Sequence, residues 1–314
     1  MNVIMTAPRL AAPAVALIEA AGGRLHYMDP YPSAEAVAAL AAKVGAVAIL
    51  SRQGPVTKAV MDAAPGLRVV ARHGVGVDDV DIAEALRRGI VVARAPGSNT
   101  RAVAEHAIAM ILALAKDLKP LSANVAAGGW RGAATKVRDI HGLRLGLLGC
   151  GAIGQAVARL ATAFGMEIAG HDPAATSAPG ITLMPLQALL ARSEILSLHL
   201  PFLPATRHIV DGPALAALPP GAMLVNTARG GLIDEPALLA ALQSGHISGA
   251  ALDVFETEPP APHDALRTHP RVIATPHVAG VTDGSLVAMG VMAAECIAAV
   301  LLGHPVPPER LVFA

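Results

Sequence analysis

The chain has 314 residues, more than most single domains, so two domains are expected. Lys plus Arg and Asp plus Glu number 24 each, which gives no electrostatic reason to expect a nucleic acid or an anionic membrane as partner. The two cysteines, Cys150 and Cys296, form neither a metal-ligand cluster nor a disulfide framework, which favours a reducing cytoplasm. No signal peptide is expected, and the most apolar stretch noted, residues 107–115, is too short to span a bilayer.

Short apolar runs alternate with helical patterns from the start of the chain. Strands are predicted at residues 3–5, 24–27, 46–50, 67–71 and 90–93. Ala-rich stretches between them have helical periodicity, for example residues 33–43 and 80–88. This alternation predicts a parallel sheet with helices on both faces.

A second α/β unit is predicted to begin with one long helix over residues 100–119, followed by a Gly-rich connection that holds Trp130. Its strands are predicted at residues 143–148, 166–170, 195–200, 222–227, 249–254 and 272–275. Helices are predicted over residues 153–164 and 285–302, and the apolar face of the last one needs a packing partner. The fold class is therefore α/β, with two Rossmann-like domains in tandem.

A glycine loop, Gly149-Cys150-Gly151-Ala152-Ile153-Gly154, follows an apolar strand and opens a helix. In this context Gly149 permits a tight turn, Gly151 lets the backbone approach a pyrophosphate, and Gly154 allows the helix to pack closely on the strand. The helix N-terminus supplies oriented N–H groups and a partial positive charge. The loop therefore predicts a dinucleotide site.

Asp172 ends the strand that follows the loop, where a carboxylate accepts hydrogen bonds from the adenosine ribose. A carboxylate there repels a 2′-phosphate and no Arg follows it immediately, so NAD is favoured over NADP. The alternative is an ordinary Gly-rich turn, with Asp172 capping the next segment.

Hydride transfer to a keto acid needs a cation for the carboxylate and a proton donor for the carbonyl oxygen. Arginine suits the first task and histidine the second, and a carboxylate beside the histidine keeps it protonated and oriented. Ligands of open parallel sheets lie beyond the carboxyl ends of the strands. The side chains that follow predicted strands are His73, His171, His199, His277, Arg52, Arg72, Arg94 and Arg229. The residues alone leave several Arg–Glu–His sets open.

Several motifs occur in a fixed order along most of the chain. They are Gly74-Val75-Gly76-Val77-Asp78, Pro96-Gly97-Ser98-Asn99-Thr100, Ala104-Glu105-His106, the glycine loop, Ser197-Leu198-His199-Leu200-Pro201, Thr206-Arg207-His208, Val225-Asn226-Thr227-Ala228-Arg229-Gly230-Gly231, Ala251-Leu252-Asp253-Val254-Phe255-Glu256-Thr257-Glu258-Pro259 and Thr275-Pro276-His277-Val278-Ala279-Gly280. In these motifs the sequence resembles the D-isomer-specific 2-hydroxyacid dehydrogenases, which include glycerate, glyoxylate/hydroxypyruvate and phosphoglycerate dehydrogenases.

The resemblance implies a catalytic set of three residues. Arg229 binds the substrate carboxylate and polarises the carbonyl, His277 is the acid/base, and Glu258 hydrogen-bonds His277. The backbone N–H groups around Val75 and Gly76 hold the carboxylate from the other domain.

The resemblance also implies the cofactor contacts, with Asp253 at the nicotinamide carboxamide and residues near Leu200, Thr227 and Ala228 around the nicotinamide. The full expected set is Val103, Gly149, Gly151, Ala152, Ile153, Gly154, Asp172, Leu200, Pro201, Thr206, Thr227, Ala228, Asp253, His277, Ala279 and Gly280. One departure from the family pattern is Leu203, which stands where a Thr or similar polar residue is usual.

The resemblance further implies a discontinuous, flavodoxin-like substrate domain, residues 1–97 with 286–314, and a doubly wound NAD-binding domain, residues 98–285. A homodimer is expected through the 100–119 helix and the segment after it. The first expected substrate is a small 2-keto acid, hydroxypyruvate or glyoxylate. The alternatives are 3-phosphoglycerate, with Arg52, Arg72, His73 and Arg94 as candidate phosphate cations, and a non-enzymatic NAD-sensing corepressor.

Overall fold

A computed structural model describes residues 1–313, which form two compact units. Unit 1 comprises Met1–Asn99 and the chain from Val281 onward, and unit 2 is Thr100–Gly280. The sequence predicts a first domain of residues 1–97 with 286–314 and a second domain of residues 98–285.

Unit 1 is built on a five-stranded parallel sheet, in the order β2-β1-β3-β4-β5. Its strands are β1 (Asn2–Met5), β2 (Arg24–Tyr27), β3 (Ala46–Ser51), β4 (Val69–Arg72) and β5 (Val91–Ala93). Its helices are α1 (Ala12–Ala20), α2 (Ala34–Val44), α3 (Lys58–Ala63), α4 (Ile82–Arg87) and α12 (Asp283–Leu302), with the 3₁₀ turn η3 (Pro308–Arg310). This strand order is that of flavodoxin-like folds, as expected.

Unit 2 has a seven-stranded parallel sheet, in the order β12-β11-β10-β9-β6-β7-β8. Its strands are β6 (Arg144–Leu148), β7 (Glu167–His171), β8 (Thr182–Leu183), β9 (Ile195–Leu198), β10 (Ala222–Asn226), β11 (Ile247–Leu252) and β12 (Val272–Ala274). Its helices are α5 (Thr100–Ala115), α6 (Leu118–Ala126), α7 (Ala152–Ala163), α8 (Leu186–Arg192), α9 (Gly212–Ala217), α10 (Glu235–Ser244) and α11 (Ala265–Thr268), with the 3₁₀ turns η1 (Pro204–Thr206) and η2 (Gly230–Leu232). The chain reverses direction across the sheet at β6 and β9, as in the doubly wound dinucleotide folds.

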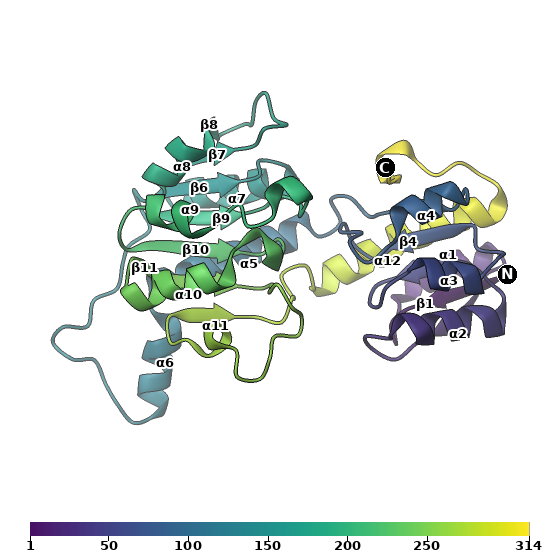
Figure 1. Ribbon diagram of the computed structural model, residues 1–314, viewed down its shortest axis with the longest axis horizontal. Helices are drawn as coiled ribbons and strands as arrows, with labels where there is room; N and C mark the ends of the chain where they lie inside the picture. Colours follow the sequence, from purple (N-terminus) through teal and green to yellow (C-terminus); the bar gives the residue numbers. More distant parts are fainter. Residues whose placement is uncertain (314) are drawn as a thin grey trace. The chain divides into compact units, whose positions relative to one another are not determined.

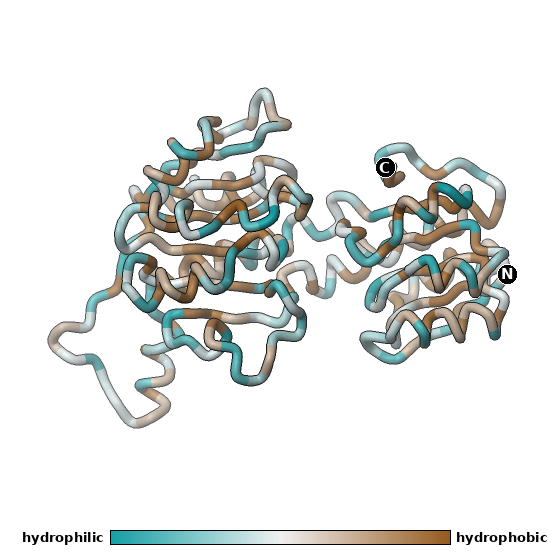
Figure 2. The backbone as a smooth tube through the Cα atoms, in the orientation of Figure 1, coloured by the Kyte–Doolittle hydropathy of each residue, from teal (hydrophilic) through white to brown (hydrophobic). Residues whose placement is uncertain are grey.

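Each sheet is covered on both faces, which confirms the α/β prediction. In unit 2, α5 and α7 pack on one face, and α8, α9 and α10 on the other. In unit 1, α1 and α12 share one face, and α2, α3 and α4 cover the other. Figure 2 shows the hydrophobic residues concentrated along the buried strands, while many connecting loops are hydrophilic.

Helix α12 brings the end of the chain back to its beginning, where it packs against α1, β3 and β4 (Figure 1). By length and composition it is apolar enough to cross a membrane. The prediction that residues 107–115 form the most apolar stretch is therefore wrong, because α12 forms a longer apolar stretch. Helix α12 places residues such as Met289, Ala293 and Ile297 in the core of unit 1, so packing in that core accounts for its hydrophobicity.

The prediction of a single helix over residues 100–119 is also wrong, because the helix is interrupted between α5 and α6. Asp117 has a left-handed backbone, with φ of 47°, and precedes Leu118. Asp tolerates this conformation better than most residues. Helix α6 and the loop after it extend away from the sheet of unit 2 (Figure 1), and no residue of α6 is buried.

Candidate active site

The glycine loop joins β6 to α7 at the point where the strand order of unit 2 reverses. Gly149 has a φ of 92°, and a Cβ there would lie 2.6 Å from the carbonyl oxygen of His199, which follows β9. A Cβ on Gly154 would lie 2.2 Å from the carbonyl oxygen of Gly149, so helix and loop approach too closely for a side chain. Gly151 has open space around its Cβ position and caps α7. This loop leaves room for a pyrophosphate at the helix N-terminus.

Asp172 lies directly beside the loop. One carboxylate oxygen accepts a hydrogen bond from the N–H of Cys150 at 2.9 Å, and the other accepts one from the N–H of Ala174 at 3.0 Å. The carboxylate thus caps its own turn and holds the loop as well. An ionised carboxyl has about four acceptor positions, so these contacts leave capacity for ribose hydroxyls.

Two buried polar atoms near the ends of β9 and β10 have no hydrogen-bond partner among residues 1–313: Nδ1 of His199 and Oγ1 of Thr227. Unpaired buried polar atoms are uncommon in folded proteins and point to a missing ligand or water. Together with the open space at Gly151, they show that the residues present fit a dinucleotide.

The remaining expected cofactor residues are distributed over the same unit. Ala152 and Ile153 begin α7, Leu200 and Pro201 follow β9, Thr206 ends η1, Ala228 follows β10, Ala279 and Gly280 follow His277, and Val103 lies on α5. The Thr206 hydroxyl is used within its own turn, where it accepts from the N–H of Leu203 at 2.8 Å and donates to the carbonyl of Pro201 at 2.8 Å.

Arg229 lies in a turn after β10 that Asn226 shapes. The buried Asn226 amide donates to the Arg229 carbonyl at 2.8 Å and accepts from the N–H of Ala228 at 2.9 Å. The next residue, Gly230, packs directly on the backbone after β11, where an added Cβ would lie 1.9 Å from the carbonyl carbon of Phe255. The Arg229 turn and the segment that carries Glu258 are therefore in contact.

Glu258 and His277 are hydrogen-bonded, with 2.7 Å between Oε2 and Nδ1. The other Glu258 oxygen accepts from the N–H of Phe255 at 3.1 Å. Burial alone would raise the pKa of Glu258, but the His277 contact and the nearby Arg229 charge outweigh it and lower the pKa below its usual value. Glu258 is thus ionised at neutral pH. Because it contacts Nδ1 of His277, the Nε2 atom on the other side of the ring does not face Glu258.

The loop that carries His277 is held by Asp253, which is 1% exposed. The Asp253 carboxylate accepts hydrogen bonds from the N–H groups of Val278 at 2.9 Å and Ala279 at 2.8 Å, and from the Thr275 hydroxyl at 2.5 Å. Its backbone carbonyl accepts from the N–H of His277 at 2.8 Å. His277 has a φ of 53°, an uncommon backbone conformation that persists only where the surroundings hold it. Asp253 supplies that restraint, and its expected contact with a nicotinamide stays a prediction.

Val75 and Gly76 belong to unit 1, in the loop after β4. Among residues 1–313 their backbone N–H groups make no hydrogen bond, and both residues are partly exposed. Consecutive unpaired N–H groups are suited to bind an anion. Gly74, with a φ of 149°, begins this loop in a conformation that favours glycine.

Residue-type reasoning did not find the supporting groups Asn226, Gly230, Thr275 and His106. His106, on α5, lies 3.2 Å from the Thr275 hydroxyl and 3.7 Å from Asp253. The Gly-Gly pair after Arg229 was a signal of close backbone packing, since glycine is needed where two backbones meet. The other contacts join residues far apart in sequence, and nothing local indicates them.

Comparison with known proteins agrees with this geometry. Residues 108–279 match the NAD binding domain of the D-isomer specific 2-hydroxyacid dehydrogenases, and all of them lie in unit 2. Two parallel α/β units, one of which carries a dinucleotide loop, define a two-domain protein with a dinucleotide-binding unit. Within that class, the chain belongs to the D-isomer specific 2-hydroxyacid dehydrogenase family, and its cofactor is NAD.

Curated relatives include the D-3-phosphoglycerate dehydrogenases of Mycobacterium leprae, 41% identical over 273 residues (85% of this chain and 52% of the relative), and of Methanocaldococcus jannaschii, 41% identical over 254 residues (79% and 48%). The chain spans about half the length of these relatives. Among solved structures, the TT0316 protein of Thermus thermophilus is similar over 100% of both chains, with a TM-score of 0.92 and 35% identity. A glyoxylate reductase from Paecilomyes thermophila has a TM-score of 0.86 and 28% identity, covering 99% of this chain and 97% of that one.

The two glycines after Gly149 are expected to respond differently to alanine. Gly154→Ala forces a methyl group against the Gly149 carbonyl, so we expect the free energy of unfolding to fall by about 1–3 kcal/mol. Gly151→Ala meets no atom within 4 Å and has a φ of −69°, so stability should be unchanged while NADH binding weakens. Denaturant unfolding and NADH titration of both variants test this, and equal stability losses would contradict it.

Proposed function

We propose that this chain reduces a small 2-keto acid to the D-2-hydroxy acid, using NADH. The observation that carries the proposal is the Glu258–His277 pair beside the Arg229 turn, a set that combines a cation with a carboxylate-supported proton donor. When bound, the dinucleotide supplies the hydride.

Each of the three residues has one task in this proposal. The planar Arg229 guanidinium binds the substrate carboxylate and orients the carbonyl carbon. His277 donates a proton to the carbonyl oxygen as the hydride reaches the carbon, which turns the ketone into an alcohol. Glu258 holds the His277 ring by Nδ1, so that the imidazolium charge is stabilised before the transfer and the ring keeps its orientation after it.

We also propose the division of tasks between the units. Unit 2 binds NAD and carries the proposed catalytic side chains, and the N–H groups of Val75 and Gly76 in unit 1 bind a carboxylate. The two cysteines are consistent with a cytoplasmic protein, because both are buried and free. Burial, and to a smaller extent the charge of Asp172, raises the pKa of the Cys150 thiol to about 11.

An unphosphorylated acid such as hydroxypyruvate or glyoxylate is the proposed substrate. Of the four candidate phosphate cations, Arg72 is paired with Asp79 at 2.7 Å. His73 is buried, and burial together with the Arg52 and Arg72 charges lowers its pKa to about 4, so it is neutral at neutral pH. Of the four candidates, Arg72 is thus already paired within unit 1, and His73 is not a cation at neutral pH.

The second candidate is 3-phosphoglycerate, which is favoured by the names of the curated relatives and by Arg52. The partly exposed Arg52 side chain makes no hydrogen bond or ion pair within residues 1–313. Arg94 is exposed after β5, but β4 separates β5 from β3, which places the two strand ends about 10 Å apart. A phosphate at Arg52 would therefore gain a second cation from this group only if the Arg94 side chain reached across the end of β4.

Arg229→Ala tests the proposed reaction. Losing a charged, two-pronged contact to the carboxylate should lower kcat/KM for every accepted keto acid by about 100-fold or more, while NADH affinity stays within about 3-fold. Arg192→Ala is the control, because Arg192 makes a surface ion pair with Glu167 in the same unit. Wild-type kcat/KM in Arg229→Ala would show that the carboxylate binds elsewhere.

A substrate panel with Arg52→Gln separates the two substrates. We expect wild-type kcat/KM for hydroxypyruvate or glyoxylate to exceed that for 3-phosphohydroxypyruvate by about 10-fold or more, since one free arginine stabilises a phosphate only modestly. Arg52→Gln and the control Arg94→Gln should leave this preference unchanged. A preference for the phosphorylated acid that is lost specifically in Arg52→Gln would establish the second candidate, and no turnover of any acid would favour the corepressor reading.

We further propose that the chain forms a homodimer through α5, α6 and the loop after α6. This region exposes large apolar side chains, at Leu118 (54%), Val125 (54%), Trp130 (77%) and Val137 (41%). Apolar side chains gathered on one projecting segment are typical of a surface that another chain covers.

Trp130→Ala is expected to shift the chain from dimer toward monomer, because a buried interface tryptophan commonly contributes about 2 kcal/mol or more to association. Analytical ultracentrifugation across a range of concentrations measures the shift. Phe313→Ala is the control, as Phe313 is similarly exposed (69%) but belongs to unit 1. A wild-type chain that is monomeric at all concentrations would refute the dimer.

A further inference from the structure

Arg72 is the last residue of β4, and its guanidinium connects three segments of unit 1. Nη1 lies 3.0 Å from the carbonyl oxygen of Arg52 and 3.1 Å from the hydroxyl of Ser51, at the end of β3. The same nitrogen pairs with the Asp79 carboxylate at 2.7 Å. Nε donates to the carbonyl oxygen of Gly76 at 2.8 Å. One side chain thus ties the loop after β4 to the neighbouring strand.

The contact with Gly76 falls where the loop has little other support. On the near side, the carbonyl of Gly74 accepts from the N–H of Ala95 at 2.8 Å, and on the far side that of Val77 accepts from the N–H of Val80 at 3.0 Å. Between these two anchors, the backbone of Val75 and Gly76 makes one hydrogen bond to the described residues 1–313, and that bond is the contact with Arg72. Because a peptide group is planar, holding the Gly76 carbonyl fixes the plane that also contains the N–H of Val77, and the Gly76 N–H can then reorient only by rotation about the backbone bonds of Gly76 itself.

Asp79 gives Arg72 a fixed partner. The Asp79 backbone carbonyl accepts from the N–H of Val56 at 2.8 Å, which anchors this residue near the end of the β3–α3 connection. The Arg72 and Asp79 side chains are 20% and 25% exposed, so the pair is shielded from water more than a surface ion pair. A guanidinium presents several donors in a rigid plane, and only such a group can reach the carboxylate and the Gly76 carbonyl together.

We propose that Arg72 is a positioning residue that holds the Val75–Gly76 loop in the conformation that receives the substrate carboxylate. This proposal rests on the function proposed above for that loop. It assigns Arg72 to the shape of the carboxylate site, in place of the direct phosphate contact considered from the sequence.

Arg72→Lys is the first test, because lysine keeps a positive charge for Asp79 but carries all its donors on one nitrogen and has none in the place of Nε, which reaches Gly76. We expect the KM for the keto acid to rise by about 10-fold or more, with the KM for NADH unchanged, since a misplaced binding group is costly even over small distances. Arg72→Gln removes the charge too and should raise the KM for the keto acid at least as much, with an additional loss of stability.

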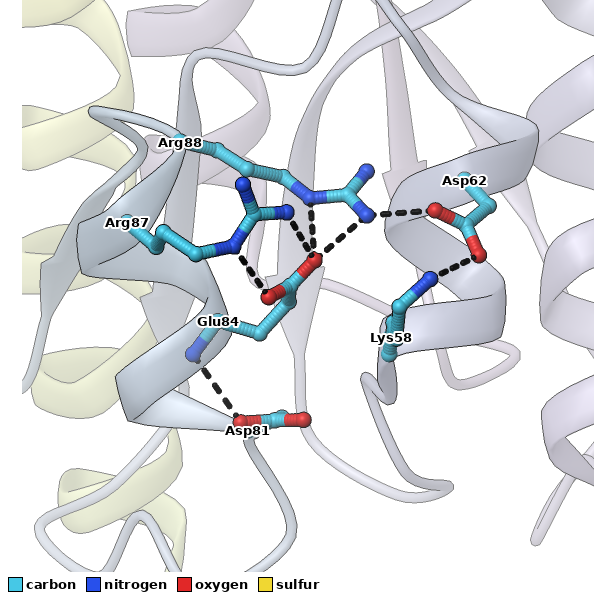
Figure 3. A network of polar contacts seen from close by, with 6 residues as sticks. All are labelled: Lys58, Asp62, Asp81, Glu84, Arg87 and Arg88. Carbon is cyan, nitrogen blue, oxygen red and sulfur yellow. Dashed lines mark hydrogen bonds and ion pairs between the residues drawn. The ribbon is translucent and has the colours of Figure 1, made fainter.

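Arg88→Gln is the matched control. Arg88 is exposed to nearly the same extent as Arg72, 21% against 20%, and it also links segments of unit 1, through the carboxylates of Asp62 and Glu84. Figure 3 shows that this network joins α3 and α4 through Lys58, Asp62, Glu84, Arg87 and Arg88. Its loss should lower stability without changing the KM for the keto acid. An equal rise of that KM in Arg88→Gln would overturn the proposal, because general weakening of unit 1 would then explain it.

Hydrogen exchange provides a readout that does not depend on turnover. The amides of Ala95 and Val80 donate to loop carbonyls, so their exchange should become faster in Arg72→Lys and not in Arg88→Gln. Unchanged exchange, or faster exchange with an unchanged KM for the keto acid, would overturn the proposal. If the wild type turns over no keto acid at all, the proposed function fails, and exchange at these two amides still decides whether Arg72 holds the loop.

Discussion

The buried carboxylate of Asp253 is the contact on which the catalytic side of unit 2 depends. A charge removed from water is costly unless hydrogen bonds replace its hydration. Asp253 obtains them from Thr275, Val278 and Ala279, and these donors belong to the segment that carries His277. The requirement to satisfy the carboxylate therefore fixes the backbone of His277, the proposed proton donor, including its positive φ. The restrained backbone places the His277 ring within hydrogen-bond distance of Glu258.

A similar arrangement is found at the ends of other parallel strands in both units. Asn226 closes the turn before Arg229 with its amide, Asp172 holds the glycine loop with its carboxylate, and Arg72 holds the loop of unit 1 with its guanidinium. In each case a polar side chain at or just after a strand end satisfies the backbone of a loop. Strands and helices supply the rigid base, and these few hydrogen bonds convert it into defined positions for atoms that bind or react.

Features with a local physical cause could be predicted from the sequence. The glycine loop could be predicted because tight turns and close packing demand glycine at set positions. The buried parallel strands could be predicted because they form short apolar runs. The break at Asp117 was missed, because the apolar pattern of α5 continues into α6, although Pro120 in the first turn of α6 is a local signal of a new helix start. The support of Asp253 from residues more than twenty positions away could not be seen either, since a sequence shows a carboxylate but not what surrounds it.

Arg52 and Arg72 show most clearly why charge alone does not define a site. Both follow or end a strand of the same sheet, so the sequence offers them as equivalent cations for a phosphate. Their surroundings separate them: Arg72 has its charge paired by Asp79 and its donors used by backbone carbonyls, whereas the Arg52 side chain is available. The partners of a cation, and not its position along the chain, decide whether it binds substrate or shapes the loop that does. For this fold, substrate preference is therefore to be sought in the cations that unit 1 leaves unpaired.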